Sequence, residues 1–221
     1  FTTLVSFVKQ KYGINLQQKR VLIEGRMTNM LRERGLTNFQ QYLDILFKDS
    51  SGKEVTTLLN KLTTNLSYFM REPDHYQYLR DSILPQLVRT HGHNRDLRIW
   101  SAGCSAGQEA YTTAMVLDEF FGPQKHLWDT RILASDISMR VLEKAKQGIY
   151  PADDIRDIPP AWRNKYFKLL PNGQYQVCEK IRNEVIFRSI NLMDAFSFRK
   201  PFDVIFCRNV MIYFDGPTKE R

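Results

Sequence analysis

Apolar residues recur at helical spacing through the first sixty residues, and strand-like alternation is absent there. Four segments there have a helical pattern. In the second the apolar residues are Leu16, Ile23, Met27, Met30 and Leu31, and in the third they are Phe39, Tyr42, Leu43 and Leu46. Gly13 and Gly35 stand where helices commonly end, and Asn15 or Thr37 can cap the helices that follow. The pattern therefore predicts a small helical bundle over residues 1–60.

From about residue 96 the pattern changes to short apolar runs that alternate with amphipathic segments. We expect strands in "LRIWSAG" (97–103), "TRILASD" (130–136), "EVIFRSINLMD" (184–194) and "FDVIFCRNVMIYF" (202–214). Helices are expected at 107–121 and 138–148. This alternation predicts a doubly wound α/β domain with a parallel sheet over 96–221, and 61–95 as a connecting segment with the domain's first helix.

One stretch, residues 148–183, does not continue the α/β repeat because it is rich in proline. Its segment "KYFKLLPNGQYQVCEKI" carries Asn172-Gly173, a strong signal for a tight turn between two strands. We predict a small antiparallel β-subdomain inserted in the α/β domain.

Composition narrows the classes of protein. The 221 residues carry 32 Lys and Arg against 24 Asp and Glu, a net charge of +8 that favours anionic partners. No nucleic-acid-binding motif accompanies the charge, and no apolar run approaches the roughly 20 residues of a membrane span. Three cysteines at unrelated spacings imply neither disulfides nor zinc, and the pair His91 and His93 is expected in a solvated loop. We expect a reduced, cytoplasmic, metal-free protein.

The loop in "IWSAGCSAGQEAY" (99–111) follows a buried strand and opens a helix, as nucleotide-binding loops do. It contains Gly103 and Gly107, but neither G-x-G-x-x-G nor the Lys-Ser or Lys-Thr pair of a P-loop. Glu109 stands two residues past Gly107, where its charge would repel a phosphate. The ligand of this loop is therefore expected to lack phosphate.

Two carboxylates indicate what that ligand is. Asp136 ends the second strand, where an acidic residue accepts ribose hydroxyls in dinucleotide folds, and Glu109 lies at a helix start, where the helix dipole stabilises an anion. S-adenosylmethionine has a ribose diol, an amino group and a sulfonium, and no phosphate. The open alternatives are a helix N-terminal carboxylate without ligand for Glu109 and an N-cap for Asp136. Together the two favour an adenosylmethionine site over a dinucleotide site.

Several segments resemble, in order and spacing, the chemoreceptor glutamate methyltransferases of the CheR family. They are "TTNLSYFMRE" (63–72), "IWSAGCSAGQEAY" (99–111), "ASDIS" (134–138), "INLMD" (190–194) and "FDVIFCRNVMIYFD" (202–215). The resemblance covers the whole chain. It implies an N-terminal all-helical domain followed by a Rossmann-like S-adenosylmethionine-dependent methyltransferase domain with a small antiparallel β-subdomain, truncated here at its C-terminal end. The implied activity is methyl esterification of glutamates on bacterial chemoreceptors.

The resemblance also implies a set of cofactor-binding residues. They are Asn65, Ser67, Arg71, Glu109, Asp136, Asn191, Leu192, Arg208 and Asn209. Departures from the family pattern are mild. Ser67 stands where Thr is more usual, Met70 stands where Phe is common, and Gln108 stands in place of the first of two Glu residues. Glu109 retains the second carboxylate.

Catalysis by such an enzyme needs no base, because a glutamate with an ordinary pKa of about 4.3 is already ionised. The expected catalytic residues, Arg71 and Tyr213, would orient the substrate carboxylate. The alternatives are an ion pair of Arg71 with Glu72 or Asp74, and a core position for Tyr213.

Recognition of an acidic helical receptor segment requires cations along one line. Lys19, Arg26 and Arg34 fall within about 80° of each other on the helix expected at 16–34, with Arg20 at the edge of that sector. The alternative is a solvated polar face. The family also has members that tether to a C-terminal receptor pentapeptide, but the short hairpin here favours recognition by the helical domain. We also expect a monomer.

Three other functions stay open from the residues alone. A nicotinamide oxidoreductase would need the missing glycine pattern, and a nucleic-acid methyltransferase usually carries an Asn/Asp-Pro-Pro-aromatic motif where "CRNVMIY" stands. A non-catalytic receptor-binding module that retains the cofactor is the third. We expect no nucleic acid partner and no membrane insertion.

Overall fold

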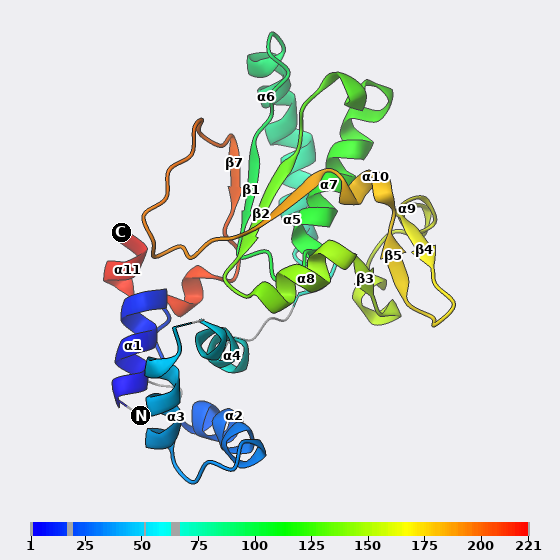
Figure 1. The fold of residues 1–221 in the computed structure, drawn as a ribbon. Coiled ribbons are helices and arrows are strands. Elements are labelled where there is room, and N and C mark those ends of the chain that lie inside the picture. Colours follow the sequence, from blue (N-terminus) through cyan, green and yellow to red (C-terminus); the bar gives the residue numbers. More distant parts are fainter. Residues whose placement is uncertain (1, 17–19, 51, 63–66, 221) are drawn as a thin grey trace. The chain divides into compact units, whose positions relative to one another are not determined.

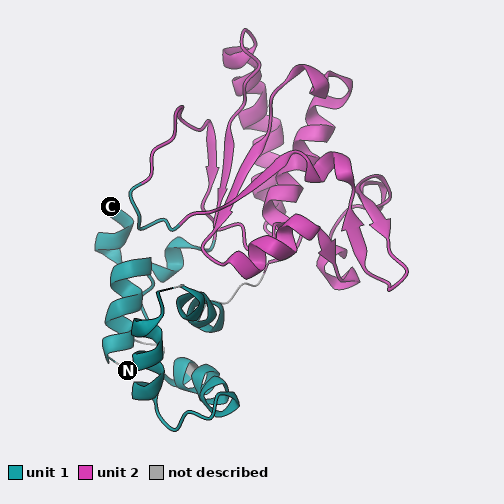
Figure 2. Ribbon diagram, viewed as in Figure 1, with its two compact units in different colours: residues 1–64, 191–195, 209–221 teal, residues 65–190, 196–208 magenta. Residues whose placement is uncertain are grey.

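The computed structural model describes residues 2–16, 20–50, 52–62 and 67–220. The chain forms two compact units, each of which draws on segments that are distant in sequence (Figures 1 and 2). Unit 1 comprises residues 1–64, 191–195 and 209–221, and unit 2 comprises 65–190 and 196–208.

Unit 1 contains the predicted bundle, whose helices are α1 (Thr2–Tyr12), α2 (Arg20–Glu33), α3 (Phe39–Lys48) and α4 (Lys53–Leu62). Their apolar stripes are buried, as the helical spacing predicted. The cap of α3 is Asn38, whose side chain accepts a hydrogen bond from the Gln41 backbone N–H, and not Thr37 as predicted. The prediction for Asn15 depends on residues 17–19, outside the described residues.

Two late segments of the chain belong to unit 1 and pack on α1. The Asn191 side chain donates to the Lys11 carbonyl at 2.9 Å, and Lys9 pairs with Asp215 at 2.7 Å. Gly13 has φ +71°, and a Cβ there would lie 2.7 Å from the Met193 sulfur. Glycine is therefore needed both for the backbone conformation and for the close approach of residue 193.

Unit 2 contains the predicted parallel sheet, with strand order β6-β2-β1-β7 (Figure 1). The strands are β1 (Ile99–Ala102), β2 (Ile132–Asp136), β6 (Val185–Ser189) and β7 (Val204–Phe206). Helix α7 (Gln108–Phe121) connects β1 to β2 through η2 (Gly122–Leu127), and α8 (Met139–Gln147) follows β2. Upstream of the sheet lie α5 (Pro73–Tyr78), a π-helical turn η1 (Leu79–Ile83) and α6 (Leu84–His91).

The predicted hairpin is present between β4 (Phe167–Leu169) and β5 (Tyr175–Val177). β3 (Ile149–Tyr150) pairs antiparallel with β5 and completes a three-stranded sheet, and the same stretch contains η3 (Ala152–Ile155) and α9 (Pro160–Tyr166). Residues predicted as the end of the second hairpin strand instead form α10 (Glu179–Arg182). The β-subdomain is thus confirmed, with more helix than the sequence indicated.

The expected strand over 202–214 is mostly wrong. β7 has three residues, after which Asn209 adopts the left-handed conformation (φ +57°). Residues Met211–Tyr213 form a 3-10 turn, η4, and Gly216–Glu220 form α11. Asn tolerates a positive φ better than most residues, so Asn209 fits the turn that follows the strand although the flanking residues are apolar. Within the described ranges, no helix is both long enough and apolar enough to cross a bilayer.

Candidate functional site

The glycine loop between β1 and α7 lies at the carboxyl edge of the sheet. The backbone N–H groups of Gly103 and Cys104 both donate to the Ser135 carbonyl, each at 2.8 Å. Gly107 has φ +92°, and a Cβ there would lie 2.9 Å from the Ala145 Cβ and 3.2 Å from the Phe187 ring. Gly107 thus allows the start of α7 to pack closely on α8 and β6, so its role does not require a phosphate.

Asp136 ends β2 and organises the backbone around it. Its two carboxylate oxygens accept hydrogen bonds from the N–H groups of Ser105 and Ser138, each at 2.9 Å. Burial raises the pKa of Asp136, while these backbone donors oppose the rise. The N-cap of α8 is Ser138, so the alternative in which Asp136 is that cap is wrong. A carboxylate has about four acceptor positions, so Asp136 retains capacity for a ligand hydroxyl.

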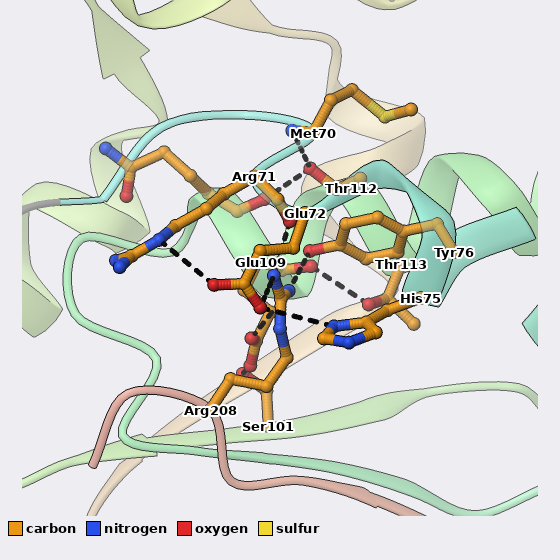
Figure 3. Close-up of polar contacts among 11 residues, drawn as sticks. Met70, Arg71, Glu72, His75, Tyr76, Ser101, Glu109, Thr112, Thr113 and Arg208 are labelled. Atoms are coloured by element: carbon orange, nitrogen blue, oxygen red, sulfur yellow. Dashed lines mark hydrogen bonds and ion pairs between the residues drawn. The ribbon is translucent and has the colours of Figure 1, made fainter. Parts of the chain in front are cut away.

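Glu109 lies in the first turn of α7, and its side chain is 13% exposed. Oε1 accepts a hydrogen bond from the Ser101 hydroxyl of β1 at 2.6 Å, and Oε2 accepts one from Arg208 Nη1 at 3.2 Å (Figure 3). Burial raises the pKa of Glu109, and Ser101 and Arg208 both act to lower it. The carboxylate is therefore held in a place where keeping its charge costs free energy.

Arg208 follows β7 by two residues and brings three parts of unit 2 together. Nη1 also donates to the Tyr76 hydroxyl at 2.9 Å, while Nη2 donates to the Arg71 carbonyl and to Glu72 Oε2, the latter at 3.2 Å. Nε is buried and has no hydrogen-bond partner among the described residues. A buried donor without an acceptor costs free energy, and an anionic group of a ligand would satisfy it.

Residues 67–72, which we call the strap, lie over α7 and carry predicted site residues. Gln108 Nε2 donates to the Ser67 carbonyl at 3.2 Å and to Asp154 Oδ2 at 3.1 Å. The Met70 N–H donates to the Thr112 hydroxyl at 3.3 Å, and Met70 and Glu72 have φ +58° and +56°. Non-glycine residues adopt this conformation at a cost, so the strap stores strain of the kind that clusters at functional sites.

Arg71 and Glu72 form the ion pair that sequence reasoning offered as an alternative. Arg71 Nε lies 3.7 Å from Glu72 Oε1, and its guanidinium carbon lies 6.0 Å from the Tyr68 ring centroid. Glu72 also approaches His75 Nδ1 at 3.4 Å. The ion pair leaves the substrate-binding role of Arg71 a prediction.

Four predicted site residues, Asn191, Leu192, Asn209 and Tyr213, belong to unit 1. Tyr213 ends η4, and its carbonyl accepts a hydrogen bond from the Asn15 N–H at 2.8 Å. That these residues share a site with Glu109 and Asp136 stays a prediction. Asn65 lies outside the described residues.

The cations predicted to bind the substrate have partners within unit 1. Arg20 pairs with Glu24 at 2.7 Å, and Arg34 pairs with Glu54. Arg26 Nη1 donates to the Lys61 and Leu62 carbonyls at 3.3 and 3.2 Å, at the end of α4. Lys19 lies outside the described residues. Arg26 thus has a structural contact that a single-helix projection does not reveal, and the recognition role of these four residues stays a prediction.

Two residues of the site, Ser101 and Tyr76, were not predicted from the sequence. Ser101 is a polar residue in an otherwise apolar strand, which was an available signal. Tyr76 lies on the buried side of α5 and is 2% exposed, so its position in the sequence is that of an ordinary core aromatic. His91, by contrast, pairs with Asp203 at 3.0 Å instead of lying free in a loop.

The donors and acceptors of this site fit S-adenosylmethionine. Asp136 offers acceptors for a ribose diol, Glu109 an acceptor for an ammonium or a hydroxyl, and Arg208 Nε a buried donor for a carboxylate. Two carboxylates at this edge of the sheet would repel a pyrophosphate. The chemistry of the site therefore matches a cationic, phosphate-free adenosyl ligand.

Comparisons with known proteins agree with this geometry. Residues 1–63 match the all-alpha domain of CheR methyltransferases, and residues 65–221 match their SAM binding domain. A chemotaxis protein methyltransferase of Borreliella burgdorferi is 43% identical over 220 residues, which are 98% of this chain and 78% of that protein. Chemotaxis protein methyltransferase 2 of Pseudomonas aeruginosa is 40% identical over 214 residues (95% and 74%), and the chemotaxis protein methyltransferase of Escherichia coli is 36% identical over 227 residues (100% and 76%).

Proposed function

Because the chain belongs to the CheR methyltransferase family, and is therefore an S-adenosylmethionine-dependent methyltransferase, we propose that it methylates glutamate side chains of bacterial chemoreceptors. The product is a glutamyl methyl ester. The observation that supports this most is the Glu109–Arg208 pair in a parallel-sheet domain whose strand β2, next to β1, ends in Asp136.

The cofactor supplies an activated methyl group on a sulfonium, which is a good leaving group. The residues of the chain bind and orient. Asp136 accepts hydrogen bonds from the ribose hydroxyls, Glu109 accepts from the amino group or ribose, and Arg208 Nε donates to the carboxylate end. Buried charge-assisted hydrogen bonds of this kind are stronger than neutral ones, so the site discriminates by charge as well as by shape.

The substrate carboxylate is ionised at neutral pH, so the reaction requires alignment and exclusion of water more than proton transfer. Arg71 and Tyr213 perform that alignment. The Arg71 guanidinium grips the carboxylate, and the Tyr213 hydroxyl donates to the oxygen that does not attack, which leaves the attacking oxygen nucleophilic.

The receptor segment is an acidic helix, and unit 1 recognises it through basic residues between positions 19 and 34. Lys19, Arg20, Arg26 and Arg34 contribute positive charge, so affinity falls as salt rises. The contact of Arg26 with the end of α4 means that its charge reversal tests folding as well as recognition. Arg20 is the better residue to reverse, because it is exposed and its ion pair with Glu24 lies within one helix.

Two measurements test the proposal. In calorimetry, S-adenosylmethionine and S-adenosylhomocysteine should bind and NAD should not. A radiolabelled methyl group should then appear on a receptor methylation fragment as a base-labile ester, and should disappear when the acceptor glutamates are replaced by alanine. Cofactor binding without any ester on a receptor fragment would indicate a non-catalytic receptor-binding module, and a base-stable label on nucleic acid would overturn the choice of substrate.

A further inference from the structure

Tyr76 contacts the guanidinium that the proposed function assigns to the cofactor. Its hydroxyl accepts a hydrogen bond from Arg208 Nη1 at 2.9 Å, and the same nitrogen donates to Glu109 Oε2 at 3.2 Å (Figure 3). The guanidinium carbon also lies 5.3 Å from the centroid of the Tyr76 ring. One nitrogen of Arg208 therefore joins the tyrosine to the carboxylate.

Tyr76 is itself firmly placed. It is 2% exposed, and its ring packs against Phe206 of β7 with centroids 6.0 Å apart. Burial raises the pKa of Tyr76 well above its ordinary value, so the hydroxyl stays protonated at any physiological pH. The side chain is a rigid neutral partner for the cation.

We propose that Tyr76 is a positioning residue that aligns Arg208, and through Arg208 the Glu109 carboxylate, for binding of the cofactor. This inference rests on the proposed function, because it assumes that Arg208 and Glu109 receive an adenosylmethionine.

The arrangement of donors on Arg208 supports this role. A guanidinium presents five N–H groups in a fixed planar fork. Nη2 donates hydrogen bonds to the Arg71 carbonyl and the Glu72 carboxylate, both in the strap. Nη1 donates to the Tyr76 hydroxyl and the Glu109 carboxylate. Contacts at both ends of the fork fix its rotation and hence the direction of the Nε–H. Without the tyrosine hydroxyl, the Nη1 end is restrained by Glu109 alone.

The same contact should be visible in the pH dependence of binding. Several titratable or polar groups face Glu109. They are Ser101 on β1, Arg208 after β7, Glu72 in the strap, Tyr76 on α5, and the thiols of Cys104 and Cys207. Burial raises the pKa of Glu109 and Arg208 lowers it. If Arg208 is less well aligned, the pKa of Glu109 rises further. If binding needs the ionised carboxylate, then as the pH is lowered the variant loses affinity at a higher pH than the unmodified chain does.

The variant Tyr76→Phe tests the proposal, with Tyr78→Phe as its matched control. Tyr78 lies on the same helix and is 62% exposed. Tyr76→Phe keeps the ring under the guanidinium and removes one hydrogen bond to a charged group. We expect S-adenosylhomocysteine to bind about three- to tenfold more weakly, and the acid limb of binding to move to higher pH. Tyr78→Phe should change neither quantity.

A double-mutant cycle with Arg208→Lys separates positioning from packing. If Tyr76 acts through the Arg208 fork, the change of Tyr76 to Phe has little further effect on affinity once residue 208 is lysine. Equal effects in both backgrounds, or a Tyr76→Phe variant that matches Tyr78→Phe in affinity and pH limb, would overturn the proposal. An unmodified chain that binds no S-adenosylhomocysteine would instead refute the proposed function.

Discussion

Replacing Glu109 with glutamine should change ligand binding and folding stability in opposite directions. Glutamine has the size of glutamate, so its amide oxygen can accept from Arg208 Nη1 and its amide group can donate to Ser101. The two present contacts, at 2.6 and 3.2 Å, therefore have neutral equivalents. The substitution removes a charge and little else.

The loss in cofactor binding follows from the kind of hydrogen bond that is replaced. A charge-assisted bond contributes roughly 1–2 kcal/mol more than a neutral one, which corresponds to about five- to thirtyfold weaker binding. Calorimetry with S-adenosylhomocysteine at neutral pH measures this directly. Glu143→Gln on α8, whose side chain is 59% exposed, provides the control and should bind as the unmodified chain does.

The stability of the ligand-free chain should not fall, because burial raises the pKa of Glu109. A carboxyl group whose folded pKa lies above its unfolded value destabilises the folded state once both states are ionised. For the unmodified chain, this cost shrinks as the pH falls through the raised pKa and is gone below the unfolded value of about 4.3. Glu109→Gln lacks the cost, so the variant should be at least as stable at pH 7.

Urea unfolding at several pH values tests the reasoning. The free energy of unfolding of Glu109→Gln should equal or exceed that of the unmodified chain at pH 7, and the two should converge as the pH is lowered. A variant that is less stable at pH 7 by more than about 1 kcal/mol would show that the carboxylate is a net stabilising group. Unchanged S-adenosylhomocysteine affinity would remove Glu109 from the site.

Three further predictions concern other parts of the chain. Asp136→Ala should weaken S-adenosylhomocysteine binding at least about tenfold and lower the free energy of unfolding by roughly 2–4 kcal/mol, because the Ser105 and Ser138 N–H groups lose their acceptor; calorimetry and urea unfolding measure the two effects. Tyr213→Phe should slow methyl transfer and leave cofactor affinity nearly unchanged, and a native transfer rate would make Tyr213 structural. Arg26→Ala should cost roughly 1–2 kcal/mol of stability through the end of α4, whereas Arg20→Ala should cost less than about 0.5 kcal/mol; equal unfolding midpoints for the two would contradict this.

The sequence predicted the elements of unit 2 well because the period of its apolar residues is a local property. Strand β2 and the carboxylate that ends it could be located from "ILASD" alone, and the lack of the common glycine patterns argued against a phosphate ligand. Glu109 could be placed at a helix start because the small-residue loop that marks this start directly precedes it in the sequence.

What the sequence did not reveal depends on contacts between distant residues. Arg26 meets the end of α4, 35 and 36 residues away in the chain, so no projection of α2 alone shows it. Tyr76 meets Arg208 across 132 residues, and nothing in "PDHYQY" marks its hydroxyl. The strand β7 was predicted but made too long, because the apolar residues after Phe206 have strand propensity and yet continue into a turn with a left-handed Asn209.

The strained strap has a consequence for how this protein can evolve or be engineered. Glycine adopts a positive φ without the cost that Met70 and Glu72 incur, so at these positions the backbone alone would favour glycine. At residue 72, however, glycine removes the carboxylate that pairs with Arg71, His75 and Arg208. A library selected only for thermal stability would thus weigh relief of backbone strain against loss of these ion pairs, whereas a selection for methyl transfer would also retain the placement of Arg71 and Arg208. Comparing the two selections would map where the chain gives up stability for activity.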